Sequence, residues 1–119
     1  MEILNYVHAD ELKTASNDEL VSINNEIRNG CVTYWDTECQ IMGDKTILTL
    51  SKKPSEIWIK YFIQFKNNFS LPSDVIFLIN EGKFICSNSF NPHLYCLLHK
   101  MVDYVNFDVS NEIKGKYVL

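Results

Sequence analysis

The apolar residues of this chain alternate between helical spacing and strand-like runs, and this alternation constrains the fold more than any other feature. Helical spacing, with apolar residues three or four positions apart, occurs in 17–29, 54–68 and 92–105. Runs rich in β-branched and aromatic residues fill the two intervening segments, 32–50 and 75–86. We therefore predict one α+β domain spanning all 119 residues, with about three helices packed on an antiparallel sheet built from two hairpins. Short strands at the two chain ends would extend that sheet.

Capping and helix-breaking residues indicate where the helices begin and end. Ser16 stands three residues before Glu19, which is the spacing of a capping box, and Gly30 stands where helices often end. Pro54 suits the first turn of the second helix, and the pair Asn91-Pro92 predicts an N-cap followed by the first helical position. The apolar residues that we expect in the core are Leu20, Ile23, Ile27, Trp58, Phe62, Phe65, Phe69, Leu94, Leu98, Met101, Val102 and Val105.

Turn residues predict the two hairpins. Gly43 and Asp44 separate the strand-like runs 32–35 and 46–50, although the polar residues that follow Trp35 interrupt the first strand. In the second hairpin, Asn80-Glu81-Gly82 follows the run 75–79 and supplies a glycine for a positive φ. Because the run 75–79 is continuously apolar, we expect it to be covered on both faces or to occupy the centre of the sheet.

The charged residues are unevenly distributed along the chain. Residues 1–44 hold nine acidic and two basic residues, a balance of −7, whereas residues 45–119 hold six acidic and nine basic residues, a balance of +3. The formal net charge of −4 therefore conceals an acidic first third. Ten of the 11 basic residues are lysines, and the exception is Arg28. Arginine is the side chain that most often makes paired hydrogen bonds to phosphate and guanine. Because the chain has only one arginine, direct nucleic-acid binding is disfavoured.

A group of histidine and cysteine residues is the strongest candidate for chemistry. His93, Cys96 and His99 lie on the predicted last helix, and Cys86 lies on the strand before it. Residues 93 and 99 diverge by about 120° around a helix, so one metal ion would take the third ligand only with strain. A Cys–His nucleophile would also need an oxyanion hole, for which no sequence pattern is present. We therefore assign no catalytic residue, metal site or cofactor.

Carboxylates and two aromatic residues in the first third are the candidate partner-binding residues. Asp36 and Glu38 alternate along the predicted strand, so both would point to one face. An acidic face of this kind would dock on a basic surface of a protein partner, because complementary charge raises association rates and sets specificity. The candidate contact residues are Asp10, Glu11, Asp18, Glu19, Glu26, Tyr34, Trp35, Asp36 and Glu38.

The predicted function is a non-enzymatic protein–protein interaction module, acting as a small acidic inhibitor or adaptor. The excess of lysine, asparagine and isoleucine is typical of AT-rich coding DNA, and small acidic chains of this kind are common among phage and other mobile-element accessory proteins. The expected partner is a nucleic-acid-handling protein, because such proteins present basic clefts. The start of the chain lacks a basic region and an apolar block, which predicts a cytoplasmic protein (host-cell cytoplasm if viral) with no membrane segment.

Two alternatives remain at this level. The first is a homo-oligomeric structural or regulatory domain such as a homodimer, because fifteen aromatic residues exceed what one core of this size needs. The second is a small enzyme or metal-binding protein that uses His93, Cys96 and His99. Four cysteines without a Cys-x-x-Cys pair fit free thiols in a reducing compartment.

Overall fold

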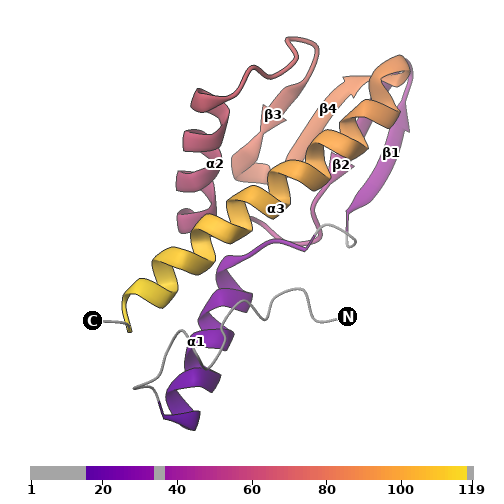
Figure 1. Ribbon diagram of the computed structural model, residues 1–119. Helices are drawn as coiled ribbons and strands as arrows, with labels where there is room; N and C mark the ends of the chain where they lie inside the picture. The colour runs from indigo at the N-terminus through magenta and orange to yellow at the C-terminus, as the bar shows by residue number, and fades with distance from the viewer. Residues whose placement is uncertain (1–15, 34–36, 118–119) are drawn as a thin grey trace.

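The computed structural model describes residues 16–33 and 37–117. The three predicted helices and the antiparallel sheet are confirmed, in the predicted order (Figure 1). Two short 3₁₀ turns accompany the second hairpin. The elements are α1 (Asn17–Gly30), β1 (Glu38–Met42), β2 (Lys45–Thr49), α2 (Glu56–Asn68), β3 (Ile76–Leu78), η2 (Ile79–Glu81), β4 (Lys83–Ser87), η3 (Asn88–Phe90) and α3 (Asn91–Gly115).

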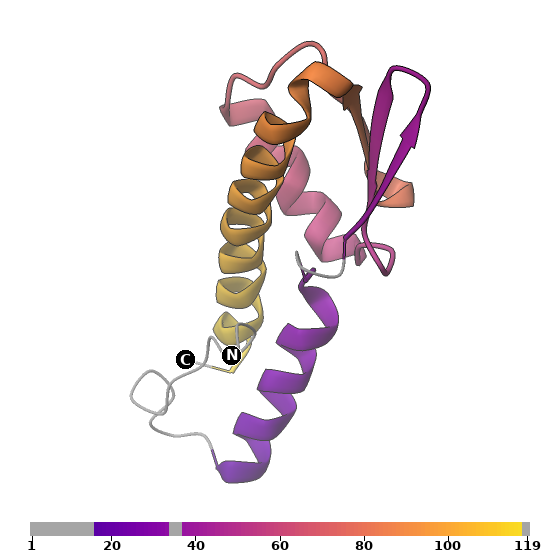
Figure 2. The same cartoon turned by 90° about the vertical axis from the view of Figure 1, so that its right-hand side faces the viewer.

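The four strands form one antiparallel sheet in the order β1-β2-β4-β3. The central strands pair with Leu48 opposite Phe84, and both side chains are fully buried. Directly opposite residues share a face, so alternate residues on each strand divide the sheet into a covered and an open face. Helices α2 and α3 lie on the covered face, and no described helix lies over the open face (Figure 2).

The long helix α3 contributes side chains to two parts of the core, one against the sheet and one against α1 and α2. Its N-terminal part lies over β2 and β4, whereas its C-terminal part extends past the sheet toward α1 and α2 (Figure 1). The first part buries Leu94 and Leu98, and the second part buries Val109 and Ile113. Gly30 at the end of α1 permits close packing here, because a Cβ at this position would lie 3.2 Å from Val109 Cγ1.

A buried asparagine on α3 connects α2 to the chain that follows α1. Asn106 Oδ1 accepts hydrogen bonds from Trp58 Nε1 at 2.8 Å and from the backbone N–H of Val32 at 3.1 Å. Asn106 Nδ2 donates to the carbonyl oxygen of Val32 at 2.7 Å. Ser55 Oγ donates to the carbonyl of Gly30 at 2.8 Å, beside the same three residues. We call this region, defined by Gly30, Val32, Ser55, Trp58 and Asn106, the helix junction.

The first strand lies later in the chain than the sequence predicted. β1 begins at Glu38, whereas the strand-like run was 32–35. Val32 is buried, and the side chain of Asn106 pairs with both its N–H and its C=O, as a neighbouring strand would. The backbone hydrogen bonds that a neighbouring strand would make with Val32 are therefore made by a helix side chain. Tyr34 and Trp35 lie outside the described residues.

The second hairpin corrects the prediction for the run 75–79. β3 is a three-residue edge strand, neither central nor covered on both faces, and Ile76 is 53% exposed. The core takes Val75 and part of Phe77, while Ile76 and Leu78 point to the open face. A continuous apolar run therefore reflects a strand whose outward side chains are also apolar.

Two helix boundaries also differ from the prediction. α2 starts at Glu56, after the Ser55 N-cap, whose Oγ accepts from Trp58 N at 3.2 Å. α3 continues ten residues beyond the predicted end at 105. Asn91 is helical rather than an N-cap, and its side chain donates to Thr46 Oγ1 at 3.2 Å. At the C-terminal end, α3 passes into a turn at Tyr117, and the predicted terminal strands otherwise fall outside the described residues.

Candidate functional site

The acidic candidates on α1 lie at its two ends. Asp18 and Glu19 occupy the first turn, where Ser16 Oγ accepts from the backbone N–H of Glu19 at 3.2 Å and donates to Glu19 Oε1 at 3.3 Å, so Ser16 is the N-cap as predicted. Both carboxylates are exposed and face the positive end of the helix dipole. Glu26, near the other end, accepts a hydrogen bond from Tyr117 Oη and lies 4.0 Å from Lys116 Nζ. Glu26 therefore binds the end of α3, and Asp18 and Glu19 remain oriented to solvent.

The remaining acidic candidates do not join those on α1. Glu38 is exposed on β1, on the open face of the sheet. Figure 1 places β1 and the start of α1 at opposite ends of the molecule. The described acidic candidates therefore occupy two separate places rather than one face. Five candidates lie outside the described residues: Asp10, Glu11, Tyr34, Trp35 and Asp36.

An exposed aromatic patch lies where the end of α2 meets the middle of α3. We define it as Phe69, Tyr104 and Phe107, whose exposed fractions are 47%, 49% and 57%. Phe69 stacks on Phe65 with a centroid distance of 4.3 Å, and Tyr104 lies 5.9 Å from the same ring. Because Phe65 is buried, two of the exposed rings are anchored on the core. Large rings held in this way provide contact area with little conformational freedom to lose.

A shallow hollow borders the aromatic patch on α3. It has a volume of about 540 Å³ and is lined by Lys100, Asp103, Tyr104 and Phe107, which follow helical spacing along one face. Asp103 precedes Phe107 by four residues, and Asp108 follows Tyr104 by four, so an acidic side chain lies beside each ring. Asp103 is also 3.7 Å from His99 Nε2. The surface thus combines rings with two carboxylates and the single amine of Lys100.

The open face of the sheet carries a second group of apolar side chains. Ile47, Ile85 and Ile76 are directly opposite one another on β2, β4 and β3. Met42 lies on the same face at the β1 edge and is exposed. The face also carries Glu38, Lys45, Thr49, Lys83 and Ser87. Among the described residues, this face contains no aromatic ring.

The histidine and cysteine candidates are divided between surface and core. His93, Cys96 and His99 are exposed on α3, whereas Cys86 is buried on β4. Burial raises the pKa of the Cys86 thiol above its ordinary value, which favours the unreactive thiol form. Burial also raises the pKa of Cys31 to about 12. Within the described ranges, no group of three or more His, Cys, Asp or Glu side chains is placed to hold a metal ion.

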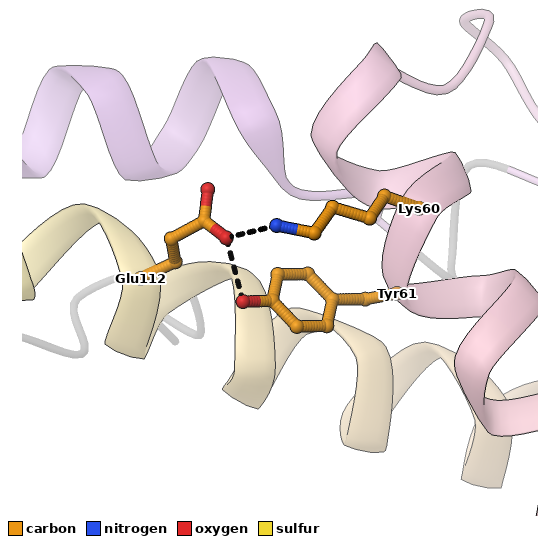
Figure 3. Close-up of polar contacts among 3 residues, drawn as sticks. All are labelled: Lys60, Tyr61 and Glu112. Atoms are coloured by element: carbon orange, nitrogen blue, oxygen red, sulfur yellow. Dashed lines mark hydrogen bonds and ion pairs between the residues drawn. The ribbon is translucent and has the colours of Figure 1, made fainter.

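A cluster of titratable side chains joins α2 to α3 (Figure 3). Glu112 Oε1 accepts hydrogen bonds from Lys60 Nζ at 2.7 Å and from Tyr61 Oη at 2.6 Å. These donors lower the pKa of Glu112, with Lys60 contributing most. The hydrogen bond to Glu112 raises the pKa of Tyr61 to about 12. Acid–base catalysis favours pKa values near neutral pH, whereas these shifts move both groups away from it, so the cluster fits a structural contact.

Comparison of the chain with known protein families, curated proteins and solved structures found no match. Across 16–33 and 37–117, none of the helices combines the length and the apolar character needed to cross a bilayer.

The aromatic patch was missed at the sequence level because the last helix was ended too early. The core face of α3 continues from Val105 through Val109 to Ile113. Extending that spacing would have left Tyr104 and Phe107 outside the buried face, as two rings on the solvent-exposed side of an amphipathic helix. Phe69 was expected in the core because it continues the stripe of α2, but it lies just past the helix end and is half exposed.

Proposed function

We propose that this protein is a non-enzymatic protein–protein interaction module, acting as a small acidic inhibitor or adaptor of the phage or mobile-element accessory type. Its partner would be a nucleic-acid-handling protein that presents a basic surface. The observation that carries the proposal is the aromatic patch, where Phe69, Tyr104 and Phe107 are exposed together. Binding energy at protein interfaces concentrates in a few aromatic and arginine side chains, and this patch offers three such anchors.

The charges around the patch support a basic partner. Asp103 and Asp108 flank the two rings of α3, and each is exposed. A lysine or arginine of the partner can approach a carboxylate while its aliphatic stem lies on the adjacent ring. Lys100 also lines the hollow and would favour an acidic group at that one position. The partner surface that fits is therefore basic over most of its area, with one acidic contact near Lys100.

The acidic first third would act at longer range. Asp18 and Glu19 at the start of α1 and Glu38 on β1 lie away from the patch (Figure 1). Such charges change the rate of encounter more than the lifetime of the complex. In this proposal the patch supplies the docking contacts, and the acidic candidates attract the basic partner toward the molecule.

The proposal is tested by isolating a partner and measuring its affinity for patch variants. The immobilised protein captures partners from its native host, and the captured protein is identified by mass spectrometry, produced separately and measured by biolayer interferometry. Phe107→Ser should weaken binding by at least about tenfold, as expected for an interface anchor. The double variant Asp103→Lys, Asp108→Lys should slow association and reduce its dependence on salt.

Ile63→Ser is the matched control. Ile63 is 47% exposed on α2, and it lies two residues from Phe65, which places it on the other side of that helix. This change should leave the affinity within about twofold, as most substitutions outside a hot spot do. Equal affinity of Phe107→Ser and wild type would refute docking at the patch. A loss of affinity confined to Asp18→Lys or Glu38→Lys would place the contacts in the acidic first third instead.

A further inference from the structure

The two edges of the sheet differ in how open they are to pairing. β3 has three residues and runs directly into the η2 turn, so it offers little backbone to a neighbour. β1 has five residues, all exposed, and within 16–33 and 37–117 its only strand partner is β2. Its register with β2 is unbroken from Glu38 to Met42, so no bulge twists the edge away. β1 also lacks proline and lysine, which commonly protect edge strands.

The hairpin turn determines which backbone groups of β1 point outward. Gly43 has φ +63° and no other residue of the turn has a positive φ, as in a two-residue type II′ turn. The pair beside such a turn, Met42 and Lys45, exchanges both backbone hydrogen bonds, and so does every second pair along the hairpin. Consequently Gln40 points its backbone groups toward β2. Cys39 and Ile41 direct their N–H and C=O groups to the outer side of the sheet.

We propose that β1 pairs antiparallel with β1 of a second copy of this chain, about a two-fold axis at Gln40. Cys39 then exchanges backbone hydrogen bonds with Ile41 of the second copy, and the symmetric pair forms at the other end. Two four-stranded sheets become one continuous sheet with the helices of both copies on the same side. The arrangement rests on the β1 edge and does not depend on the aromatic patch.

Side chains along β1 complement each other in this register. Cys39 and Ile41 share the covered face, because their partners on β2, Leu48 and Thr46, are buried. Ile41 is nevertheless 63% exposed, and pairing brings it beside Cys39 of the second copy. The same contact occurs twice by symmetry, so two side chains from each copy, four in the dimer, would cover each other.

Charge favours a second copy over an arbitrary strand. In the proposed register Glu38 lies opposite Met42 of the second copy, whose neighbour on β2 is Lys45. Glu38 and Lys45 of the second copy are then on the same face, two strand spacings or about 10 Å apart, within reach of their side chains. The two Glu38 residues lie at opposite ends of the pairing. In-register parallel pairing would place them side by side, which like charges disfavour.

The dimer should be weak. A single five-residue edge on each copy buries less than the roughly 1,200 Å² that marks the lower end of stable interfaces. We therefore expect a monomer at about 10 μM and a substantial dimer fraction near 1 mM, as mass action requires for a weak association. Sedimentation velocity across this range measures the equilibrium. A monomer at every concentration would refute the proposal.

The register is tested by a disulfide on the two-fold axis. The variant Cys39→Ser, Gln40→Cys, Cys96→Ser removes both exposed thiols and places one at the axis, while Cys31 and Cys86 stay buried. The opposed residues form a pair without mutual hydrogen bonds, with Cα atoms about 4.5 Å apart, which suits a disulfide. Oxidation should convert most of the protein to a covalent dimer at concentrations where the wild type associates.

Control variants distinguish this edge from other modes of association. Ile76→Cys in the background Cys39→Ser, Cys96→Ser places the thiol on the β3 edge and should not cross-link. Ile41→Lys should shift the association toward monomer by at least about tenfold, because it adds an edge charge. Phe107→Ser should leave the association unchanged. Cross-linking at position 76 in place of 40, or loss of the dimer with Phe107→Ser, would overturn the β1 model, and circular dichroism verifies that each variant is folded.

Discussion

The helix junction and the β1 edge show opposite kinds of contact. At the junction, Asn106 bonds to Val32, 74 residues away, and to Trp58, 48 residues away, in a fully buried setting. On β1, by contrast, all five residues are exposed, and their strand partner β2 follows immediately in the sequence. Long-range buried polar contacts specify how distant segments assemble. A short-range, exposed strand adds little to that assembly and leaves its outer side available for binding.

This contrast predicts that substitutions have very different costs in the two regions. Buried donors and acceptors left without partners carry the full penalty of lost hydration. Exposed side chains on an edge strand lose almost nothing on replacement. Three substitutions follow in order of decreasing effect: one in the junction, one in the cluster of Lys60, Tyr61 and Glu112 between α2 and α3, and one on the β1 edge.

The largest effect is expected from Asn106→Leu. The change keeps the branching and the number of heavy atoms of the side chain but leaves Trp58 Nε1 and both backbone groups of Val32 without their buried partner. We expect the free energy of unfolding to fall by about 4 kcal/mol, from several unsatisfied groups at about 1–3 kcal/mol each. Urea denaturation monitored by tryptophan fluorescence measures the loss. Asn111→Leu, at an exposed position on the same helix, is the control, and a loss below about 1 kcal/mol for Asn106→Leu would show that the junction does not depend on this side chain.

An intermediate effect is expected from Glu112→Gln. Glu112 accepts hydrogen bonds from Lys60 and Tyr61, but the cluster lies near the surface, so we expect a loss of about 1 kcal/mol at neutral pH. The folded-state pKa of Glu112 is lowered, so its contribution is present above the pKa of the unfolded chain and disappears as the pH falls through the folded-state value. The wild type should therefore lose more stability than the variant on acidification.

The same cluster predicts a second change in alkaline solution. The pKa of Tyr61 is raised from 10 to about 12, so its contribution is present below pH 10 and decreases as the pH rises toward 12. Thermal unfolding of wild type and Glu112→Gln between pH 3 and pH 11 follows both limbs. Glu81→Gln, at an exposed position in η2, is the matched control. Parallel pH profiles for wild type and Glu112→Gln would contradict the assigned contact.

The smallest effect is expected from Ile41→Ser. Ile41 is exposed on the edge strand β1, and its partner on β2, Thr46, is buried. Replacing Ile41 should therefore change the free energy of unfolding by less than about 0.5 kcal/mol. The measurement is made at low micromolar concentration to keep the monomer. Leu48→Ala on the adjacent strand is the comparison, since it empties a fully buried site and should cost about 3 kcal/mol. A large loss with Ile41→Ser would show that the edge contributes to the core.

Local signals were sufficient for most of the fold. The N-cap at Ser16, the turn at Gly43 and the apolar spacing of the helices are each determined by neighbouring residues, and the structure has the predicted order of elements. Strand positions were less predictable because tertiary contacts override propensity. Val32 reads as part of a strand, yet its backbone pairs with Asn106, a residue 74 positions later. The run 75–79 likewise could not reveal that its strand would lie at the edge.

The candidate site was less accessible to sequence reasoning than the fold. The acidic residues could be counted, but their separation onto α1 and β1 depends on how the elements pack (Figure 1). The aromatic patch requires knowing that α2 and α3 cross near Phe65 and Tyr104. Nothing local distinguishes Phe69 from the buried rings that precede it in the same stripe. Helical periodicity alone could indicate only that Tyr104 and Phe107 lie on the solvent-exposed side of α3.

The length of α3 has a thermodynamic consequence. One helix of 25 residues contributes Leu94 and Leu98 to the sheet side of the core and Val109 and Ile113 to the side that packs on α1. Because it is continuous, losing either part of the core removes packing partners from the other, and the chain should unfold in one cooperative transition. Tyr104 and Phe107 lie between these two parts. A protein bound there would raise the melting temperature of the whole molecule, since any ligand that binds only the folded chain shifts the unfolding equilibrium.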